Sequence, residues 1–353
     1  MTTITVKPFQ EAAEEWIRHL EQRDGGMTIK PRRSAGHIRN HLMKHLAERA
    51  VCDLREIDLH RLSWSLAALG SALAGSVMTT LRKFLDYAET RNWIAAENNP
   101  SKAKIPWVSA VSKRFATAPD RRNQWLAMPS RTQLILMVTR SEGMAGTALR
   151  LFILAGLRGN EARALKCAKF AFHADEPDGT GYRLNIEDAF CSQHRDPFVP
   201  KGTKTFLGER YVHLGIELSE HLVDITAGRS GDEYILHRDG IPLTSEELDE
   251  LIRQEQVRLG IGRRVLRSRG GHSYPGTYGM RHLRHAFVAL LIFDGWEDED
   301  ISTVVGHGST TVTLDIYGYL FNLRKSGWET WPSDGDPDND PDTDAMELAY
   351  DSR

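Results

Sequence analysis

Cysteine and long apolar stretches are both scarce in this sequence, and each absence excludes a class of protein. The 353 residues include 3 cysteines, Cys52, Cys167 and Cys191, which are too far apart for a disulfide framework or a paired-cysteine metal site. No apolar run reaches the roughly eighteen residues that a membrane helix requires, and the first residues lack the blocks of a secretory signal. We therefore expect a protein of a reducing compartment, the cytoplasm, without membrane association.

Negative charge is concentrated at the carboxyl end of the chain. The formal net charge is −3, but residues 333–353 hold 8 acidic side chains and a single basic one, Arg353. The rest of the chain therefore carries 44 basic against 40 acidic side chains. This small excess of basic side chains over residues 1–332 permits a polyanionic partner without requiring one. Residues 333–353, the acidic tail, have so few apolar side chains that we predict them to be disordered.

A chain of this length favours two domains, and its hydrophobic periodicity predicts a small all-helical domain over residues 1–104. The helical pattern stops at Asn99-Pro100, because the residue before a proline is pushed out of the helical region. Residues 105–122 have little periodicity and several basic side chains, which predicts a linker that either contacts a polyanion or simply connects the domains. The expected helices of the first domain are Phe9–Arg23, Ser34–Arg49, Leu59–Leu69 and Ser76–Arg91.

The second domain, residues 123–332, is predicted to be mostly helical with one small antiparallel sheet near its start, so the fold class is mainly α. Strands are expected at Tyr182–Ile186, Ala189–Ser192 and Tyr211–Leu214, where short extended segments are separated by glycine, aspartate and proline. The expected helices are Ser130–Ser141, Gly146–Ala155, Glu161–Leu165, Glu217–Ala227, Ser245–Leu259, Met280–Phe293, Asp298–Val305 and Val312–Leu320.

Two groups of histidines have spacings that occur in metal sites. His37, His41 and His45 recur at intervals of four, and His282 and His285 form an HxxH pair. Side chains at these spacings share one face of a helix. A partly exposed helix flank is the more common reason for the first row, and no further ligand cluster accompanies the pair. We therefore predict no metal site.

Four polar side chains of the second domain stand beside strongly apolar sequence. Arg158 follows the run LFILAGL, and Arg284 heads the stretch that continues as AFVALLIF. His307 follows Val304-Val305-Gly306, and Tyr317 stands in LDIYGYL. A buried charge requires a partner, so Arg158 taken alone is explained by an ion pair with Glu161. Together, two arginines, a histidine and a tyrosine indicate a phosphoryl-transfer site in which tyrosine is the nucleophile and the arginines stabilise the added negative charge. Such a site needs no metal or other cofactor.

Three blocks of the sequence resemble the tyrosine recombinases, or phage integrases, in order and spacing. They are AGLRGNEARAL around Arg158, HLRHAFVALLI around Arg284, and VVGHGSTTVTLDIYGYLF with His307 and Tyr317. The resemblance covers residues 8–325. It implies an amino-terminal helical core-binding (SAM-like) domain followed by a mostly helical catalytic domain with a small antiparallel sheet.

The resemblance also implies a role for each of these residues. Arg158 and Arg284 match the two arginines that hold the scissile phosphate. His307 matches a histidine that donates a hydrogen bond to a non-bridging oxygen or to the attacking tyrosine. Tyr317 matches the nucleophile, which forms a 3′-phosphotyrosyl bond and frees a 5′-hydroxyl. Tyr319 is a rival by spacing, but the first tyrosine attacks in the family's YGHL pattern.

Three further positions of the family pattern have candidates. Glu161 matches the family's acidic residue and is expected to orient its neighbours. The general acid is a lysine in a turn between strands, for which both Lys201 and Lys204 are candidates, and the Thr-Lys-Thr context favours Lys204. Arg281 stands where the family has the histidine of an HxxR motif. A guanidinium cannot act as a base, although it can donate hydrogen bonds to phosphate.

The function that the resemblance implies is site-specific recombination: cleavage and rejoining of duplex DNA for integration or excision. Its implied partners are double-stranded DNA, three further copies of the chain in a homotetramer on DNA, and accessory DNA-bending proteins, in the bacterial cytoplasm or nucleoid. Arg281 leaves a second function open, a catalytically impaired DNA-binding regulator on the same fold. A third, a nicking enzyme like the type IB topoisomerases, shares the chemistry but needs no tetramer.

Overall fold

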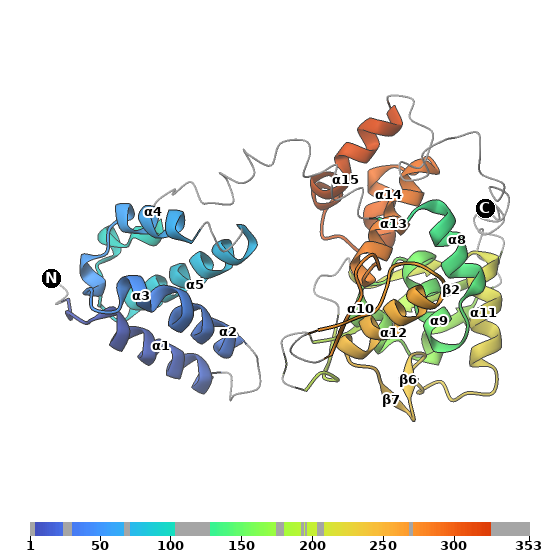
Figure 1. Ribbon diagram of the computed structural model, residues 1–353, viewed down its shortest axis with the longest axis horizontal. Coiled ribbons are helices and arrows are strands. Elements are labelled where there is room, and N and C mark those ends of the chain that lie inside the picture. Colours follow the sequence, from blue (N-terminus) through green and yellow to red (C-terminus); the bar gives the residue numbers. More distant parts are fainter. Residues whose placement is uncertain are drawn as a thin grey trace. The chain divides into compact units, whose positions relative to one another are not determined.

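The computed structural model describes residues 4–23, 30–66, 71–102, 128–173, 180–191, 194, 196–202, 208–267 and 271–325 (Figure 1). The chain divides into two compact units, an amino-terminal and a carboxy-terminal unit, with the boundary between Arg122 and Asn123. The predicted linker, residues 105–122, and the predicted acidic tail, residues 333–353, lie outside the described residues, and both stay predictions. No helix within the described ranges is long and apolar enough to cross a membrane.

The amino-terminal unit is helical and packs its elements around aromatic side chains. Its elements are α1 (Phe9–Arg23), α2 (Lys30–His37), a π-helical turn (Ile38–Leu42), α3 (Met43–Leu46), α4 (Glu56–Ser65) and α5 (Ser71–Thr90), with 3₁₀ turns at Val51–Asp53, Ala96–Asn98 and Pro100–Lys102. The ring of Phe84 on α5 meets those of Phe9 and Trp16 on α1, at centroid separations of 4.9 and 5.8 Å. All three side chains are buried, so the apolar stripes of α1 and α5 form one core.

The prediction of a single α-helix over Ser34–Arg49 is wrong, because the π-helical turn separates α2 from α3. A π turn has a longer repeat than an α turn, so residues four apart no longer share a face. His37 is buried, with Nδ1 2.7 Å from Oγ1 of Thr80, whereas His45 is exposed. The predicted exposed flank is therefore wrong for His37. The described part of the chain contains no group of three metal-binding side chains.

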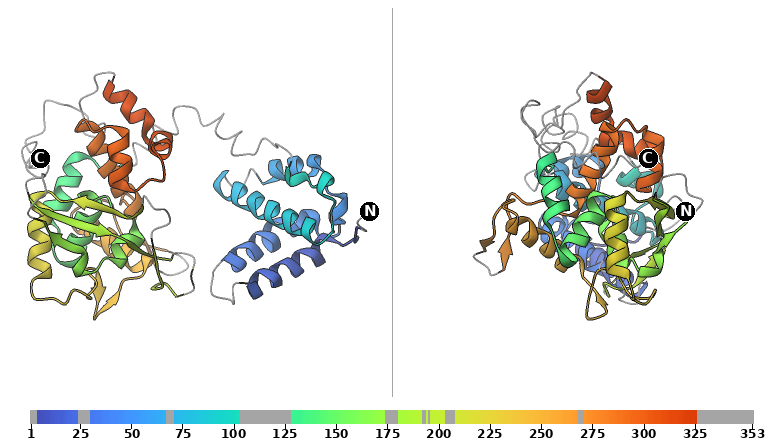
Figure 2. Two further views of the ribbon diagram at one scale, coloured as in Figure 1. Left: turned by 180° about the vertical axis from the view of Figure 1, so that it is seen from behind. Right: turned by 90° about the vertical axis from the view of Figure 1, so that its right-hand side faces the viewer.

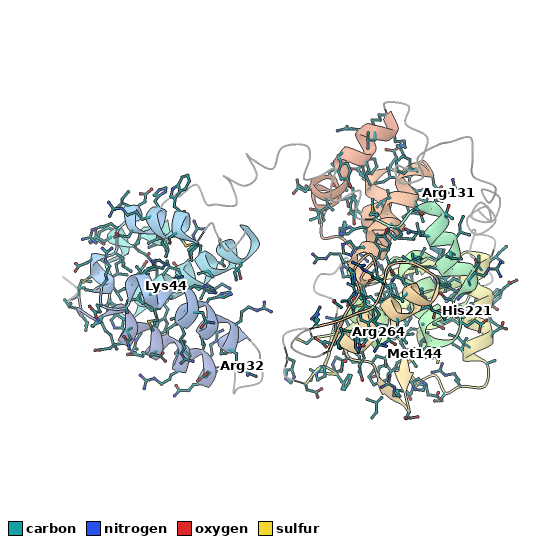
Figure 3. The ribbon with its side chains drawn as sticks, viewed as in Figure 1. Arg32, Lys44, Arg131, Met144, His221 and Arg264 are labelled. Atoms are coloured by element: carbon teal, nitrogen blue, oxygen red, sulfur yellow. The ribbon has the colours of Figure 1, made fainter. Side chains whose placement is uncertain are left out.

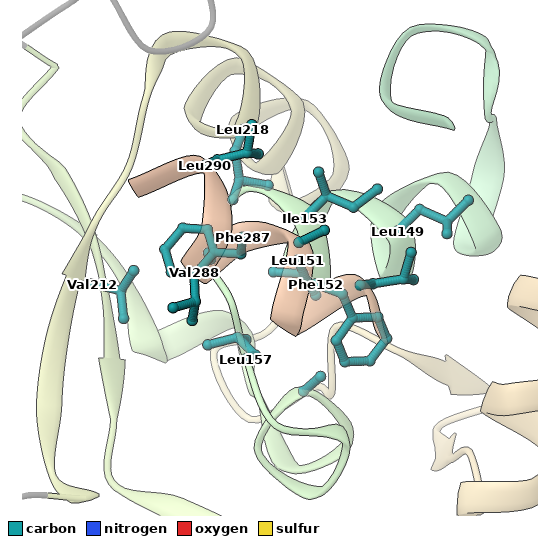
Figure 4. Packing of buried hydrophobic residues seen from close by; sticks show 14 of the residues in the cluster. Leu149, Leu151, Phe152, Ile153, Leu157, Val212, Leu218, Phe287, Val288 and Leu290 are labelled. Atoms are coloured by element: carbon teal, nitrogen blue, oxygen red, sulfur yellow. The ribbon is translucent and has the colours of Figure 1, made fainter. Parts of the chain in front are cut away.

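The carboxy-terminal unit surrounds helix α13, which is buried along most of its length. Its helices are α8 (Arg131–Arg140), α9 (Gly143–Ile153), α10 (Gly159–Ala164), α11 (Ile216–Thr226), α12 (Ser245–Arg258), α13 (Met280–Phe293), α14 (Asp298–Val305) and α15 (Thr310–Lys325). Phe287 and Val288 of α13 belong to one buried core with Phe152 of α9 and with Leu157, which follows α9 (Figure 4). This core holds the segment around Arg158 against α13.

The fold class, mainly α with antiparallel sheet, is confirmed, but the described residues form four small sheets where we predict one. The three-stranded sheet has the order β1-β2-β5, with Leu184 opposite Val212. It is seen in the left panel of Figure 2, which views the molecule from behind. The extra strands have two or three residues, too few for an alternating pattern to reveal. The strands are β1 (Phe170–Phe172), β2 (Tyr182–Ile186), β3 (Asp188–Phe190), β4 (Pro200–Gly202), β5 (Arg210–His213), β6 (His237–Arg238), β7 (Ile241–Pro242), β8 (Val265–Leu266) and β9 (His272–Ser273).

Two glycines with almost the same positive φ differ in how closely their surroundings are packed. Gly156, between α9 and α10, has a φ of +59°, and Gly143, at the start of α9, has +57°. A Cβ on Gly156 would overlap the ring of Phe287, whereas one on Gly143 meets nothing within 4 Å. We expect Gly143→Ala to lower the free energy of unfolding by about 1–2 kcal/mol and Gly156→Ala by about 1–3 kcal/mol more, measured by urea denaturation. Equal losses would contradict a packing role for Gly156.

Candidate active site

The first arginine of the site is held at the start of a short helix. Arg158 precedes α10, and its backbone N–H and Nη1 donate to the two oxygens of Glu161, at 2.8 and 2.7 Å. Its Nη2 donates to the carbonyl of Gly306, after α14, at 2.7 Å. The Arg158 side chain nevertheless remains 41% exposed. Its guanidinium is thus fixed in direction and open to a ligand, and the predicted ion pair with Glu161 is present as well.

Glu161 also pairs with a second arginine. Both side chains are 3% exposed, and Nη2 of Arg210, on β5, lies 2.9 Å from Oε2 of Glu161. The Nε of Arg210 donates to the carbonyl of Val304 on α14, at 2.7 Å. Burial alone would raise the pKa of Glu161, but Arg210 and Arg158 outweigh it and lower that pKa to about 2. Glu161 is therefore an anion that orients two guanidinium groups, the role predicted for it.

Arg284 is a further buried cation of the cluster. It lies on α13, is 8% exposed, and donates through Nη1 to the carbonyl of Gly156 and through Nη2 to that of Val305, at 2.5 Å for the latter. Burial, followed by the charge of Arg158, lowers its pKa to about 9, so it is still a cation at neutral pH. Its partners are neutral carbonyls, so no carboxylate offsets its charge directly.

The cluster of Arg158, Arg210, Arg284 and Glu161 has an excess of positive charge. It brings together three guanidinium groups and one carboxylate, and the remaining acceptors are backbone carbonyls. Buried like charges repel one another unless a counter-charge is present. Guanidinium groups match the oxygen geometry of carboxylates and phosphates. The arrangement therefore favours an added anion beside the exposed face of Arg158.

His307 joins this cluster through the turn after α14. Gly306 ends the helix in a left-handed conformation, with a φ of +67°, and the backbone N–H of His307 donates to Ser302 at 2.9 Å. The His307 side chain is buried, and its Nδ1 lies 2.8 Å from Oγ1 of Thr313. Burial, then the charges of Arg284 and the other arginines, lower the pKa of His307 to about 4. The imidazole is therefore neutral at neutral pH.

Tyr317 lies on α15 against two histidines. Its side chain is 4% exposed, its ring stacks on that of His307 with centroids 6.5 Å apart, and its hydroxyl lies 2.5 Å from Nδ1 of His285 on α13. Burial raises the pKa of Tyr317 far above its usual value. Tyr319, two residues on, is half-buried, and burial raises its pKa to about 12. Of the two tyrosines, Tyr317 is the one that contacts the cluster's histidines.

The remaining predicted residues are placed differently. Arg281, in the first turn of α13, is exposed, and His282 turns toward the ring of Tyr278, with centroids 6.5 Å apart. Lys201 lies in β4 opposite Ala189, but its side chain and all of Lys204 lie outside the described residues. The structure thus brings Arg158, Arg284, His307 and Tyr317 together, and the choice of lysine stays a prediction.

Sequence reasoning misses two residues of this site. Arg210 occupies an inward-facing position of β5, where the alternating pattern of buried and exposed residues calls for an apolar side chain. An arginine in such a position is a signal of a buried partner. His285 lies four residues after Arg281 and directly follows Arg284, so the helical period could have placed it on the same face as Arg281. His285 appears in the sequence only as part of the block around Arg284 and of the HxxH pair, and neither residue is given a role by the resemblance.

Comparisons with known proteins find similarity to integrases in sequence and in fold. No family model matches the chain. The ICEBs1 integrase of Bacillus subtilis (strain 168) is 22% identical over 285 residues, which cover 81% of this chain and 71% of that protein. The Tn1549 transposon integrase, in complex with transposon right end DNA, superposes with a TM-score of 0.63 at 13% identity, over 91% of this chain and 99% of that one. A lambda integrase tetramer bound to a Holliday junction gives a TM-score of 0.51 at 14% identity, over 86% and 79%. This chain shares the fold of these structures.

Proposed function

We propose that this chain, which shares the fold of the tyrosine recombinases and the order of their motifs, is a site-specific DNA recombinase. It would cut and rejoin duplex DNA through a 3′-phosphotyrosyl intermediate. One observation carries the proposal: a surplus of guanidinium charge lies beside a buried tyrosine whose hydroxyl contacts a neutral histidine. That combination supplies both a phosphate-binding site and a nucleophile.

The positions of the arginines, His307 and Tyr317 support the following steps. The guanidinium groups of Arg158 and Arg284 bind the non-bridging oxygens of the scissile phosphate and stabilise their added charge. Nδ1 of His307 lies 2.8 Å from the hydroxyl of Thr313. With that hydroxyl as the donor, Nε2 of this neutral imidazole carries a hydrogen for donation to phosphate or tyrosine. Tyr317 attacks phosphorus and the 5′-oxygen leaves. Lys201 or Lys204 protonates it, and the phosphotyrosyl bond keeps the energy for rejoining.

A basic hairpin offers a further contact for the DNA backbone. Arg263, Arg264 and Arg267 flank strand β8 and are exposed (Arg264 is labelled in Figure 3). Among the described residues, none of the three forms an ion pair with a carboxylate, and Arg264 meets His272 of β9 at 3.1 Å. Cations of this kind release counterions from DNA on binding. The hairpin therefore supports duplex DNA as the substrate.

The assembly proposed on DNA is a homotetramer, because exchange of strands between two duplexes needs four cleaving subunits. The lambda integrase tetramer on a Holliday junction, which has the same fold, supports this number. Accessory DNA-bending proteins and a cytoplasmic or nucleoid location belong to the same proposal. The regulator hypothesis rests on Arg281 alone, and the four motif residues gathered in one cluster disfavour it.

The decisive experiment is detection of a covalent protein–DNA adduct. We expect the full chain, incubated with a library of nicked duplexes of randomised sequence in EDTA, to form complexes that survive denaturing detergent and carry DNA joined through its 3′-phosphate. The arginines supply the charge stabilisation here, so chelation should leave the yield unchanged. Binding without any adduct would instead support the DNA-binding regulator. Adducts that relax supercoiled DNA but never exchange two duplexes would support the nicking enzyme.

A further inference from the structure

The hydroxyl of Tyr317 meets a histidine to which the family pattern gives no role. His285 lies on α13, directly after Arg284, and its Nδ1 is 2.5 Å from the phenolic oxygen on α15. The two rings meet edge to face, with centroids 5.5 Å apart and planes inclined at 63°. An imidazole nitrogen at this distance accepts a hydroxyl proton without rearrangement of either side chain.

The two other candidates for this task are placed elsewhere. Arg281 occupies the family's histidine position, but its side chain is exposed and a guanidinium has no lone pair to accept a proton. His307 lies nearly parallel to the ring of Tyr317, at 13° and 6.5 Å between centroids, and its Nδ1 is already bonded to Thr313. Among the described residues, neither of these two side chains is hydrogen-bonded to the phenolic oxygen, whereas His285 is.

We propose that His285 is the general base of the cleavage step, in place of the histidine that Arg281 has replaced. This inference rests on the proposed function. As the oxygen of Tyr317 bonds to phosphorus, its O–H bond breaks and the proton moves to Nδ1 of His285. At the same time the P–O5′ bond breaks, and Lys201 or Lys204 protonates the leaving oxygen. On rejoining, the 5′-hydroxyl attacks phosphorus and gives its proton back to the neutral lysine, the bond from phosphorus to the oxygen of Tyr317 breaks, and the imidazolium returns its proton to the departing phenolic oxygen. No redox change takes place.

Burial and the charges on α13 keep the imidazole of His285 unprotonated, so that it can accept a proton. Burial is the largest influence on His285, followed by Arg281, His282 and Arg284, and together they lower its pKa to about 4. It is therefore neutral and unprotonated at neutral pH. Arg281 thus acts on the base through its charge, which a histidine at that position would not supply above its own pKa.

Among the described residues outside α13, the titratable groups that interact with His285 are Tyr317 and His307. Burial and the arginines lower the pKa of His307 to about 4 as well, so it adds no charge at neutral pH. A phosphate bound by Arg158 and Arg284 brings negative charge close to His285 and offsets these arginines. Its arrival raises the pKa of His285, which strengthens the base at the moment when the substrate is in place.

The test is the His285→Asn variant, because the amide of asparagine places an acceptor near the Nδ1 position but cannot take up a proton at ordinary pH. We expect single-turnover formation of the 3′-phosphotyrosyl adduct to slow by about 10²–10⁴-fold, with DNA binding and the circular dichroism spectrum unchanged.

The wild-type rate of adduct formation should vary little between pH 6 and 8. The variant rate should rise by about tenfold per pH unit, because the phenol must then ionise to solvent. His282→Asn, one residue away and without a contact to Tyr317, is the matched control and should cleave at close to the wild-type rate.

A second measurement keeps the inference testable if asparagine disturbs the fold. Incorporation of a fluorinated tyrosine at position 317 lowers the phenol pKa, so it should accelerate the His285→Gln variant more than the wild type. The inference is overturned if His285→Asn, folded and bound to DNA, cleaves at the wild-type rate with the wild-type pH profile, or if fluorination accelerates both proteins equally. Absence of any adduct with the wild type itself would instead overturn the proposed function, so the two failures are distinguishable.

Discussion

The Tyr317→Phe variant is expected to form no covalent adduct while binding DNA with nearly unchanged affinity. The phenolic oxygen is the atom that bonds to phosphorus, so its removal leaves no nucleophile. Phenylalanine keeps the ring that stacks on His307 and fills the same buried space, and most affinity for DNA comes from many separate phosphate contacts. Detergent-stable complexes on the nicked library measure the first quantity, and a gel-shift titration measures the second.

Tyr319→Phe is the matched control for this experiment. Tyr319 lies on the same helix, two residues on, and is half-buried, but the contacts to His285 and His307 belong to Tyr317. We expect Tyr319→Phe to keep adduct formation near the wild-type level. An adduct that persists in Tyr317→Phe and disappears in Tyr319→Phe would assign the nucleophile to Tyr319.

The second large effect is expected for the two arginines that face the phosphate. Arg284→Ala and Arg158→Ala should each slow adduct formation by about 10²-fold or more, since each removes a fixed donor from the transition state. Arg284→Ala should also lower the free energy of unfolding, because the carbonyls of Gly156 and Val305 lose a buried donor. Arg158 is half-exposed and Glu161 keeps its bond to Arg210, so the stability loss there should be smaller. Single-turnover kinetics and urea denaturation give the two measurements.

Arg263→Ala provides the control for these arginines. Arg263 is exposed beside β8, outside the cluster around Glu161. Its removal should weaken DNA binding and reduce the salt dependence of affinity, while bound DNA is cut at the wild-type rate. If Arg284→Ala instead lost binding and cleavage in equal proportion, Arg284 would be a structural or general DNA-binding residue rather than part of the catalytic site.

The sequence alone determined the helices with strong patterns and the residues of the motifs. The bounds of α1, α13 and α14 agree with those predicted, because each helix has a clear apolar period and local signals at its ends, such as the three acidic residues that open α14 and Gly306 that closes it. Arg158, Arg284, His307 and Tyr317 could be named because costly polar groups beside apolar sequence are readable from a linear chain. Their convergence in one site needed the fold.

Tertiary structure decided what depends on contacts between distant segments. The bond of Glu161 to Arg210 joins α10 to β5, and that of His285 to Tyr317 joins α13 to α15. The bond of His37 to Thr80 joins α2 to α5. Periodicity places each of these side chains on a face of its own element but does not say which element covers that face. The short strand pairs depend in the same way on partners elsewhere in the chain, because two or three residues carry too little pattern to predict pairing. The orientation of the base toward the nucleophile is therefore a property of packing between helices, and no local pattern contains it.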